Sequence, residues 1–575
     1  MTPAPWLTEL PLLLALLVPL VLMAAFIRSR GHGPRRWLPL ASLPALALAL
    51  WPGSGLHLPG VLLGTQLGTT LGSDGLARAL LLLMGLAWSA AAWFAADRMQ
   101  GPHFRSFAVA WLAGLSGMVL AAAAADIATF YTGYVAMTLA GYGLVMHDRD
   151  APARRAARIY IVLAMVGEAL ILSGLLLLAA RIGNADLATL PSAVQGFDAR
   201  LAGALLLGGF SVKIGIVPLH VWLPLAHPVA PVPASAILSG VLVKAGLLGA
   251  VRLVPAEAFD AFATAGLLAL GLITTFYGAA MGLAQQRLKT VLAYSTISQM
   301  GLLFVVLVLV LAPGERRDGP LMAVLALWLL HHGLNKAALF LAAGSAPGVS
   351  RWRMALVALP ALSLAGLPPA SGALAKAVLK ESLYGTTFAG WVVPWLAASS
   401  LATSLLMLHV FSLARGSRTA PHASGPPPPV HPAWALLVLA ALVVPWLHAG
   451  VSGLARWPGM KDILDATWPL LAAGVLWLLR GRLVRALRWA RRIPEGDLVV
   501  VAERAAAILA GAAGRLAEAA DARRQRLAAS IAHASALGEA LARRMQKTES
   551  TLVALPVVGL LLLGLAGLVW WSLAA

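Results

Sequence analysis

KIGIVPLHVWLP, residues 213–224, decides how this sequence is interpreted, because it places a charge inside a long apolar run. The run reads LAGALLLGGFSVKIGIVPLHVWLP, and Lys213 is its only charged residue. An ammonium group at the centre of a bilayer costs about 3 kcal/mol or more, so ionisable groups at that depth indicate function. The stretch also contains Pro218 and His220, which a simple membrane anchor does not need. Lys213 is therefore a candidate member of a proton pathway.

The composition is typical of a helical membrane protein with many spans. The chain has 575 residues, of which 60% are hydrophobic and 11% are charged, and its mean hydropathy is +0.83. It contains no cysteine, which excludes disulfides, thiolate-bound iron–sulfur clusters and thiol catalysis in this chain. Neither GxxxxGK(S/T) nor GxGxxG occurs, so nothing supports nucleotide hydrolysis or a dinucleotide fold.

Apolar runs long enough to cross about 30 Å of hydrocarbon recur along the chain. Sixteen runs qualify, and the second and fifteenth are the weakest. They fall near residues 6–27, 36–51, 76–96, 106–124, 126–146, 155–180, 201–223, 231–253, 261–283, 290–312, 320–343, 354–385, 391–414, 432–449, 465–480 and 551–573. The expected fold is all-α and polytopic, with about 16 transmembrane helices.

Basic residues divide unevenly between the loops. Loops after odd-numbered spans carry 22 Lys and Arg residues, and loops after even-numbered spans carry 8. The positive-inside rule then predicts that odd-numbered loops face the cytoplasm and that both termini lie outside. The same rule accounts for the formal charge of +20 without nucleic acid, because no basic face with interleaved aromatics is present. No basic residue precedes the first apolar run, which indicates a first span rather than a cleaved signal.

Three segments do not read as plain spans. Residues 51–75 are glycine-rich with alternating character, which suggests a hairpin on the outside. Residues 417–432 form a stiff proline-rich loop. Residues 495–547 place apolar residues at steps of three and four between arginines, the pattern of an amphipathic helix. A soluble coiled coil is one interpretation of this helix. Because a final apolar run follows it, a lateral helix along the cytoplasmic membrane face is the favoured one.

Ionisable residues inside the spans concentrate at a few places. They are Glu168, Lys213, His220, Lys244, His331, His332, Lys336 and Lys376. Asp126 opens the fifth span and lies too near its end to belong with them. Lys380 and Glu381, near another span end, are expected to form an interfacial pair.

Lys213 and Lys376 share a context that favours function. GIVP follows Lys213 and GLPPASG precedes Lys376, and both elements break helices. Discontinuous helices at corresponding positions of two halves are typical of transporters built from inverted repeats. The backbone groups that such breaks free are tolerable only where they face protein or a wet cavity.

Lysines and histidines of this kind are suited to proton relay. Burial disfavours the charged form of lysine, so a buried lysine can exchange a proton near neutral pH. Histidine titrates near neutrality without help and can connect lysines through water. His332 and Lys336 are four residues apart, on one face of a helix, and can exchange a proton. No triplet of His and carboxylate has metal-ligand spacing, so neither a metal nor a cofactor is expected.

Four motifs, in this order, resemble the antiporter-like membrane subunits of respiratory complex I, multisubunit cation/proton antiporters and membrane-bound [NiFe] hydrogenases. They are KIGIVPLHVWLPLAHPVAPVPASAILSGVLVKAG (213–246), RLKTVLAYSTISQMG (287–301), HHGLNKAALFLAAG (331–344) and GLPPASGALAK (366–376). The resemblance covers roughly residues 75–415. The long helix followed by a last span also resembles the distal complex I subunit and its hydrogenase counterpart.

The resemblance implies an organisation for the chain. The expected parts are helices 1–3 with an outside hairpin at 1–105, a first inverted repeat (helices 4–8) at 106–253, a second (helices 9–13) at 261–415, helices 14–15 with the Pro-rich loop at 416–494, the lateral helix at 495–547 and a final anchor at 551–575. Helices 7 and 12 are the broken ones.

The resemblance also implies roles for the buried residues. Lys213 matches the lysine of the broken seventh helix, and Lys244 the bridging lysine of the eighth. His332 and Lys336 match the histidine and lysine of the eleventh, and Lys376 matches the lysine or glutamate of the broken twelfth. The relay set is then Lys213, Lys244, His332, Lys336 and Lys376, with His220, His331 and Glu168 secondary.

The implied activity is proton or sodium translocation driven by a redox module on other subunits. This chain holds no redox site of its own and is at most the non-catalytic membrane arm of an oxidoreductase. The implied partners are other membrane subunits, with the lateral helix against a neighbouring antiporter-like subunit, in a bacterial inner membrane.

One departure from the family pattern affects the mechanism. The family has a glutamate on the fifth helix that pairs with Lys213, and this chain reads YTGYVAMTLAGY at 131–142, with Val135 at that position. Leu225 also stands where the family has an acid after WLP. We expect Glu168, one helix along, to replace the missing acid. Two alternatives remain: a cation/proton antiporter or inorganic-carbon uptake subunit, and a structural subunit that has lost pumping.

Overall fold

The computed structural model describes most of the chain in two compact units, Met1–Leu498 and Val499–Ala575. The described residues are 5–29, 34–51, 56–57, 68–69, 75–182, 187, 190–314, 319–344, 350–384, 386–416, 430–479, 493–546 and 555–574. Most of the proline-rich stretch 417–432 and the basic cluster 480–492 lie outside them.

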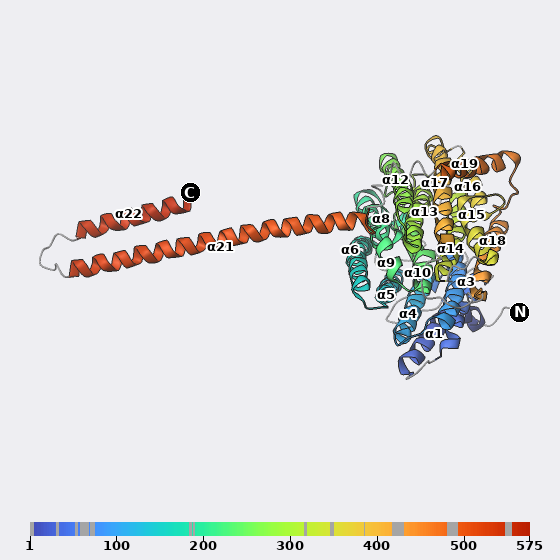
Figure 1. The fold of residues 1–575 in the computed structure, drawn as a ribbon, viewed down its shortest axis with the longest axis horizontal. Coiled ribbons are helices and arrows are strands. Elements are labelled where there is room, and N and C mark those ends of the chain that lie inside the picture. Colours follow the sequence, from blue (N-terminus) through green and yellow to red (C-terminus); the bar gives the residue numbers. More distant parts are fainter. Residues whose placement is uncertain are drawn as a thin grey trace. The chain divides into compact units, whose positions relative to one another are not determined.

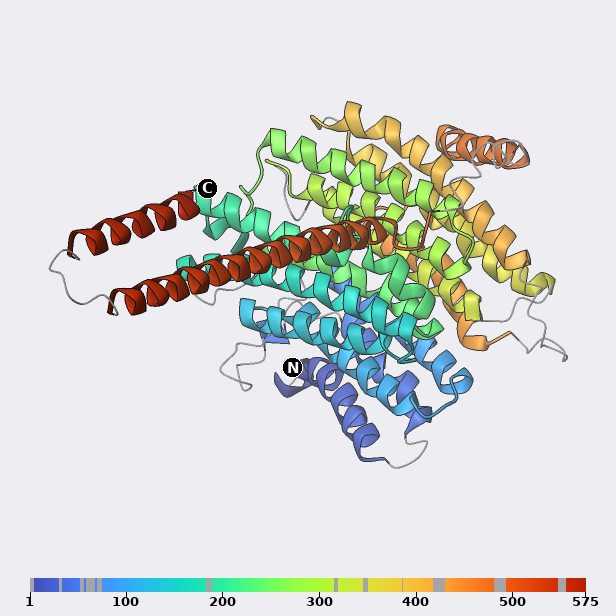
Figure 2. The ribbon, with the colours of Figure 1, turned by 60° about the vertical axis from the view of Figure 1, so that its left-hand side comes forward.

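The first unit consists of helices that lie side by side in both views (Figure 1, Figure 2). Up to the first interrupted span they are α1 (Pro5–Arg28), the 3-10 helix η1 (Arg35–Ser42), α2 (Leu43–Leu50), α3 (Gly75–Arg98), α4 (Phe104–Ala123), α5 (Ile127–Val145), α6 (Ala151–Ile182) and α7 (Leu190–Ala193). Further uninterrupted helices are α12 (Ala261–Ala284), α13 (Leu288–Val310), α14 (Pro320–Gly344), α17 (Ala389–Gly416), α18 (Pro432–Val451) and α19 (Met460–Leu478). Within residues 51–75, strands β1 (Leu56–His57) and β2 (Gly68–Thr69) pair antiparallel.

Two spans are interrupted where the sequence predicts. The half-helices are α8 (Gly196–Ile214) and α9 (Trp222–Val229), and α15 (Arg351–Ala365) and α16 (Ser371–Ser382). The first half of each pair ends at a glycine in the left-handed region, Gly215 with φ +84° and Gly366 with φ +93°. A proline follows each glycine within three residues, Pro218 and Pro369, and cannot donate a helical hydrogen bond. The expected breaks after Lys213 and before Lys376 are therefore present.

A third interruption was not expected from the sequence. The eighth span is divided into α10 (Val232–Gly240), a 3-10 turn η2 (Leu242–Lys244) and α11 (Ala245–Leu253). Val241 leaves helical geometry, with φ −123° and ψ −58°. Lys244, like the other two break-associated lysines, thus lies beside irregular backbone.

Small residues allow the helices of the core to approach closely. A side chain at Gly117 of α4 would clash with the backbone of Met137 on α5, because an added Cβ would lie 2.6 Å from that nitrogen. Gly278 of α12 meets the backbone of Ser298 on α13 at the same distance. Close packing through glycine is typical of helices inside membranes, where apolar burial alone does not drive association.

Among the described residues, ten helices are long and apolar enough to cross a membrane by length and composition. Interrupted spans do not all reach that length as single helices, so the figure of about 16 spans stays a prediction. The wholly buried candidates are Val232–Leu253, Leu288–Val310 and Pro320–Gly344, which form the centre of the unit.

The C-terminal part holds the expected long helix. α21 runs over 50 residues, Asp497–Gln546, which is about 75 Å at 1.5 Å per residue. Apolar side chains along it, such as Ile508, Leu516 and Ile531, are exposed in the isolated chain. A last apolar helix, α22 (Leu555–Ala574), follows. The lateral placement of α21 on a membrane face stays a prediction.

Candidate functional site

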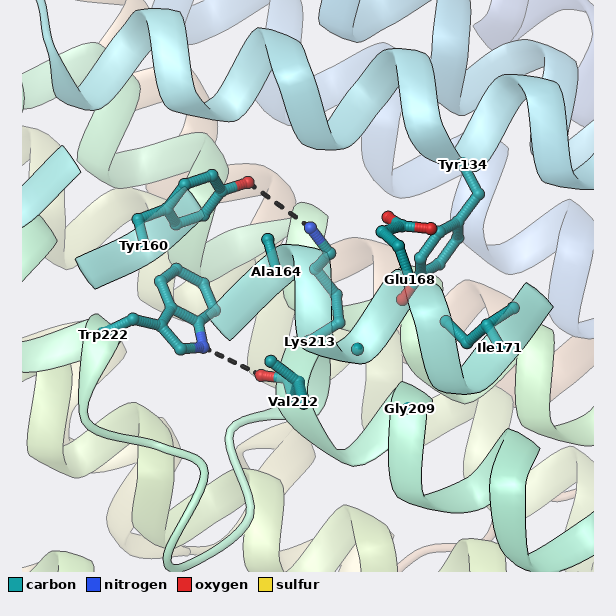
Figure 3. Close-up of a pocket in the computed structure, with 10 residues that line it drawn as sticks. Tyr134, Tyr160, Ala164, Glu168, Ile171, Gly209, Val212, Lys213 and Trp222 are labelled. Atoms are coloured by element: carbon teal, nitrogen blue, oxygen red, sulfur yellow. Dashed lines mark hydrogen bonds between the residues drawn. The ribbon is translucent and has the colours of Figure 1, made fainter. Parts of the chain in front are cut away.

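Lys213 lies in the last turn of α8, two residues before the break, with its ammonium directed into protein. The side chain is buried, and Nζ donates a 2.9 Å hydrogen bond to Oγ1 of Thr138 on α5. A second, longer bond of 3.4 Å reaches the hydroxyl of Tyr160 on α6 (Figure 3). The rings of Tyr134 and Tyr160 lie 5.6 and 5.4 Å from Nζ, within cation–π range.

Glu168 reaches Lys213 through one hydroxyl group. Thr138 Oγ1, which accepts from Lys213, lies 2.7 Å from Glu168 Oε1 and donates to it. A hydroxyl has one proton and two lone pairs, so Thr138 can accept from the ammonium while its proton is shared between the carboxylate and, at 2.9 Å, the carbonyl of Tyr134. Figure 3 shows Glu168 and Lys213 facing the same small cavity. That cavity measures about 10 Å³, the room that one water molecule needs.

Glu168 thus lies one hydroxyl group away from Lys213, and its replacement of the missing fifth-helix acid stays a prediction. Glu168 of α6 is half-buried, and its second oxygen, Oε2, has no hydrogen-bond partner within the described part of the chain. A buried carboxylate oxygen without a partner is costly and is a natural place for a bound water. Thr138, which makes the connection, was missed from the sequence, where one threonine in an apolar span carries no signal.

Lys244 and Lys336 use backbone carbonyls instead of carboxylates. Lys244 Nζ donates a 2.6 Å bond to the carbonyl of Ser239, in the last turn of α10. The C-terminal end of a helix carries partial negative charge, which stabilises a cation. Lys336 Nζ donates a 3.2 Å bond to the carbonyl of Leu292 on α13. Both side chains are fully buried.

His332 is fully buried on α14, four residues before Lys336 on the same helix. Neither of its ring nitrogens has a hydrogen-bond partner among the described residues. The expected transfer between His332 and Lys336 therefore needs an intervening water.

Lys376 and His331 form the last part of the set. Lys376 Nζ donates a 2.7 Å bond to Oγ of Ser400 on α17. His331 Nδ1 lies 2.8 Å from Oγ of Ser371, the first residue of α16, and Ser371 lies 3.3 Å from Ser363 on α15. His331 and Lys376 thus face the second break from two sides.

Polar side chains of α13 connect the middle lysines to the second break, and the sequence reasoning did not single them out. Thr296 lies 2.7 Å from Ser239, beside Lys244. Three residues along, Gln299 donates a 2.8 Å bond to Thr403 on α17, one turn from Ser400. The hydroxyls of Ser295 and Ser298 are buried with no partner among the described residues. These positions lie within the quoted motif RLKTVLAYSTISQMG, where the run of hydroxyls was the available signal.

His220, seven residues after Lys213, contacts the start of α21. It is fully buried in the turn between α8 and α9, and its Nε2 is 3.7 Å from Oδ1 of Asp497, the first residue of α21. The other oxygen of Asp497 accepts a short hydrogen bond from the hydroxyl of Tyr277 on α12. Burial raises the pKa of Asp497, but the nearby His220 ring and the hydrogen bonds from the Tyr277 hydroxyl and the Leu498 amide together hold it below its usual value.

The segment before α21 is held to the same region by a second acid. Glu495 forms a 3.1 Å ion pair with Arg287 and accepts a 2.8 Å bond from Thr290. Gly496, with φ +77°, adopts the left-handed conformation next to Leu225, which an added Cβ would meet at 2.7 Å. The root of α21, residues 493–498, therefore contacts the turn of the first interrupted span. Asp497 was not predicted to belong here.

Asp126, Lys380 and Glu381 lie near span ends and form contacts outside the relay. Asp126 caps α5 by accepting from the amide of Thr129 at 2.9 Å, as its place at a span end suggests. Lys380 and Glu381 do not pair with each other. Lys380 pairs with Asp465 at 2.6 Å, and Glu381 pairs with Arg456 at 3.1 Å. Neighbours along a helix point in different directions, so each finds its partner on the chain that follows α18.

The fold and the site define a class: a helical membrane protein with paired interrupted spans and buried lysines beside the breaks. A family model described as NADH:quinone oxidoreductase/Mrp antiporter, TM, matches residues 124–405. NADH-quinone oxidoreductase subunit N of Syntrophotalea carbinolica is 30% identical over 446 residues, which cover 71% of this chain and 91% of that protein. The chain belongs to this NADH:quinone oxidoreductase/Mrp antiporter family.

Two further similarities agree with that assignment. Hydrogenase-4 component B of Escherichia coli is 31% identical over 281 residues, which cover 43% of this chain and 40% of that protein. The solved structure of the Mrp complex from Dietzia sp. aligns over 98% of this chain and 63% of the matched one, with a TM-score of 0.69 and 21% identity. That likeness shows the fold. The chain matches about half the length, 40% to 51%, of several curated relatives.

Proposed function

We propose that the chain is a proton-translocating, antiporter-like membrane subunit of a redox-driven assembly related to complex I or to membrane-bound hydrogenases. Protons would move along a mid-membrane series that contains Lys213, Lys244, His332, Lys336 and Lys376. His220, His331 and Glu168 would be secondary members of the relay. The relatives named above, an NADH-quinone oxidoreductase subunit and a hydrogenase component, support this class of assembly.

The observation that carries the proposal is the contact of Lys213 with Glu168 through Thr138. A nearby carboxylate favours the protonated lysine, and a change in either charge alters the proton affinity of the other. The family pattern needs such an acid, and this chain has valine at position 135. The 2.9 and 2.7 Å bonds of Thr138 supply the missing connection from the next helix.

The intervening polar groups support a route between the breaks. Lys244, His332 and Lys336 share the fully buried centre, and α13 presents Thr296 toward one end and Gln299 toward the other. Unpartnered ring nitrogens and hydroxyls in this region favour bound water, which joins such groups into a proton-conducting chain.

We also infer the surroundings of the subunit. The bacterial cytoplasmic membrane is the proposed location, and the Lys and Arg asymmetry supports a topology with the odd-numbered loops inside and both ends of the chain outside. The two interrupted spans support inverted repeats at 106–253 and 261–415. The exposed apolar residues of α21 support a lateral helix that lies on the cytoplasmic face against a neighbouring antiporter-like subunit.

Proton transport by the reconstituted complex tests the proposal. Lys213→Ala should abolish redox-driven acidification of proteoliposomes while the complex still assembles. The matched control is Lys461→Ala, which removes an exposed lysine from the start of α19. Assembly is checked by the subunit content of the purified complex, so that a folding defect is not mistaken for loss of transport.

The same assay separates the alternatives. Transport at the normal rate in Lys213→Ala would contradict the proposal. Absence of transport in the unmodified complex would favour a structural subunit. A requirement for sodium or potassium on the receiving side would favour a cation/proton antiporter.

A further inference from the structure

A cavity of about 270 Å³ lies beside the second break, between α16, α17 and α19. Lys376 and Ser400 line it at one end, and Lys380, Asp462 and Asp465 line it at the other. The volume accommodates several water molecules. The first break has no comparable space within the described residues around Lys213, where the cavity measures about 10 Å³.

The two walls of the cavity carry opposite charge. Lys376 and Lys380 are four residues apart on α16, so both ammonium groups lie on one face of that helix. α19 supplies both lining carboxylates. Asp465 Oδ2 accepts from Lys380 Nζ at 2.6 Å, and Asp462 is held by Arg456 at 3.2 Å and by the Gly459 amide at 3.1 Å.

Exposure places the ion pair at the mouth of the cavity. The Lys380 and Asp465 side chains are 30% and 47% exposed, whereas Lys376 is half-buried next to Gly366 at the break. By the positive-inside rule, the loops that flank this end of α16 and α19 face the outside. A proton that leaves Lys376 toward that face must therefore pass the ammonium of Lys380.

We propose that the Lys380–Asp465 ion pair is a gate at the mouth of a water-filled vestibule through which Lys376 exchanges protons with the outside. The proposal rests on the proposed function and adds Asp465 as a positioning residue. Paired with Asp465, the charge of Lys380 presents a small barrier to a leaving proton. Unpaired, it repels a proton a few ångströms away in surroundings of low dielectric. α19, which lies outside the family match at 124–405, becomes part of the exit.

Charge removal in two steps tests the gate. Asp465→Asn should slow proton translocation about tenfold, because it leaves the Lys380 charge uncompensated. Lys380→Gln combined with Asp465→Asn should restore most of the rate, because the repelling charge is gone. If the double variant is as slow as Asp465→Asn, the gate proposal is wrong. In that case the ion pair only holds α19 in place, because removing both charges cannot restore a structural contact. Unchanged transport in Asp465→Asn would overturn it as well.

Thiol labelling tests the vestibule independently of transport. The chain has no cysteine, so each introduced thiol is the only one it contains. Ala377→Cys lies on the cavity wall and should react with a cationic, membrane-impermeant methanethiosulfonate added from outside. Ala375→Cys, on the buried side of the same helix, is the matched control and should not react. An unreactive Ala377→Cys would overturn the vestibule even in a complex that transports protons, so its failure is distinct from failure of the proposed function.

Discussion

The breaks after Lys213 and before Lys376 share a backbone design but give their lysines different surroundings. Lys213 lies in a narrow site, tied through Thr138 to a carboxylate, with room for about one water. Lys376 bonds to the neutral hydroxyl of Ser400 at the edge of a cavity of about 270 Å³. A carboxylate favours the charged lysine, and water accepts the proton that a lysine releases. One break is therefore suited to holding a proton and the other to exchanging it.

Arginine substitution tests both lysines at once and has the largest expected effect. Lys213→Arg and Lys376→Arg should each abolish translocation, because a guanidinium stays protonated in proteins. Stability should separate them. Overpacking a filled site costs about 1–3 kcal/mol, so Lys213→Arg should lower the melting temperature of the complex. Lys376→Arg has open space and should leave it unchanged; equal losses in both variants would remove the contrast between the two sites.

Loss of the Glu168 carboxylate should have the next largest effect on the rate of proton translocation. Glu168→Gln should reduce translocation about tenfold, because Lys213 loses the charge that stabilises its protonated form. Val135→Glu combined with Glu168→Gln should restore much of the rate by returning an acid to the fifth helix. Proton flux into proteoliposomes measures both, with Glu257→Gln on an exposed loop as the control. If the double variant is no faster than Glu168→Gln, the hypothesis that Glu168 replaces the acid missing at position 135 is wrong.

The sequence predicted the breaks well because they depend on local chemistry. Glycine and proline restrict the backbone at a fixed position, so GIVP and GLPPASG locate the two irregular turns. The long helix at 495–547 followed in the same way from spacing alone and is present at Asp497–Gln546. The interruption at Val241 lacks such punctuation apart from Gly240, and the sequence reasoning missed it.

The contacts around the lysines could not be predicted in the same way. Thr138 meets Lys213 across 75 positions of sequence, and Asp497 meets Tyr277 across 220. Pairs of this kind depend on how helices rotate and pack, which periodicity does not fix. Glu168 was anticipated only because the family pattern left a gap at Val135. Lys380 and Glu381 show the opposite error, since adjacency in sequence suggested a pair that helix geometry separates.

Removing the hydroxyl group beside each lysine should have smaller effects on translocation, which again differ between the two breaks. Thr138→Val deletes the bridge between Lys213 and Glu168 and should slow translocation about fivefold, because two charged partners lose a bond of the charge-assisted kind. Ser400→Ala should cost less than about twofold, because cavity water can replace the hydroxyl beside Lys376. Thr138→Ser, which keeps the hydroxyl, should transport normally. Equal losses at the two sites would show that the second break is as dry as the first.

The smallest expected effect concerns the root of α21, which contacts the first break. The second break is held by a different residue, Trp446, whose indole N–H donates to the carbonyl of Pro369. Asp497→Asn should increase hydrogen exchange in the turn 215–221 and leave 366–370 unchanged. The pKa of Asp497 is held below its usual value, so its contribution is complete above about pH 4 and is lost as pH falls further. Exchange in the unmodified protein should therefore show no Asp497-dependent change between about pH 7 and pH 5. Increased exchange at both turns would mean that the root of α21 stabilises the whole unit and not the first break.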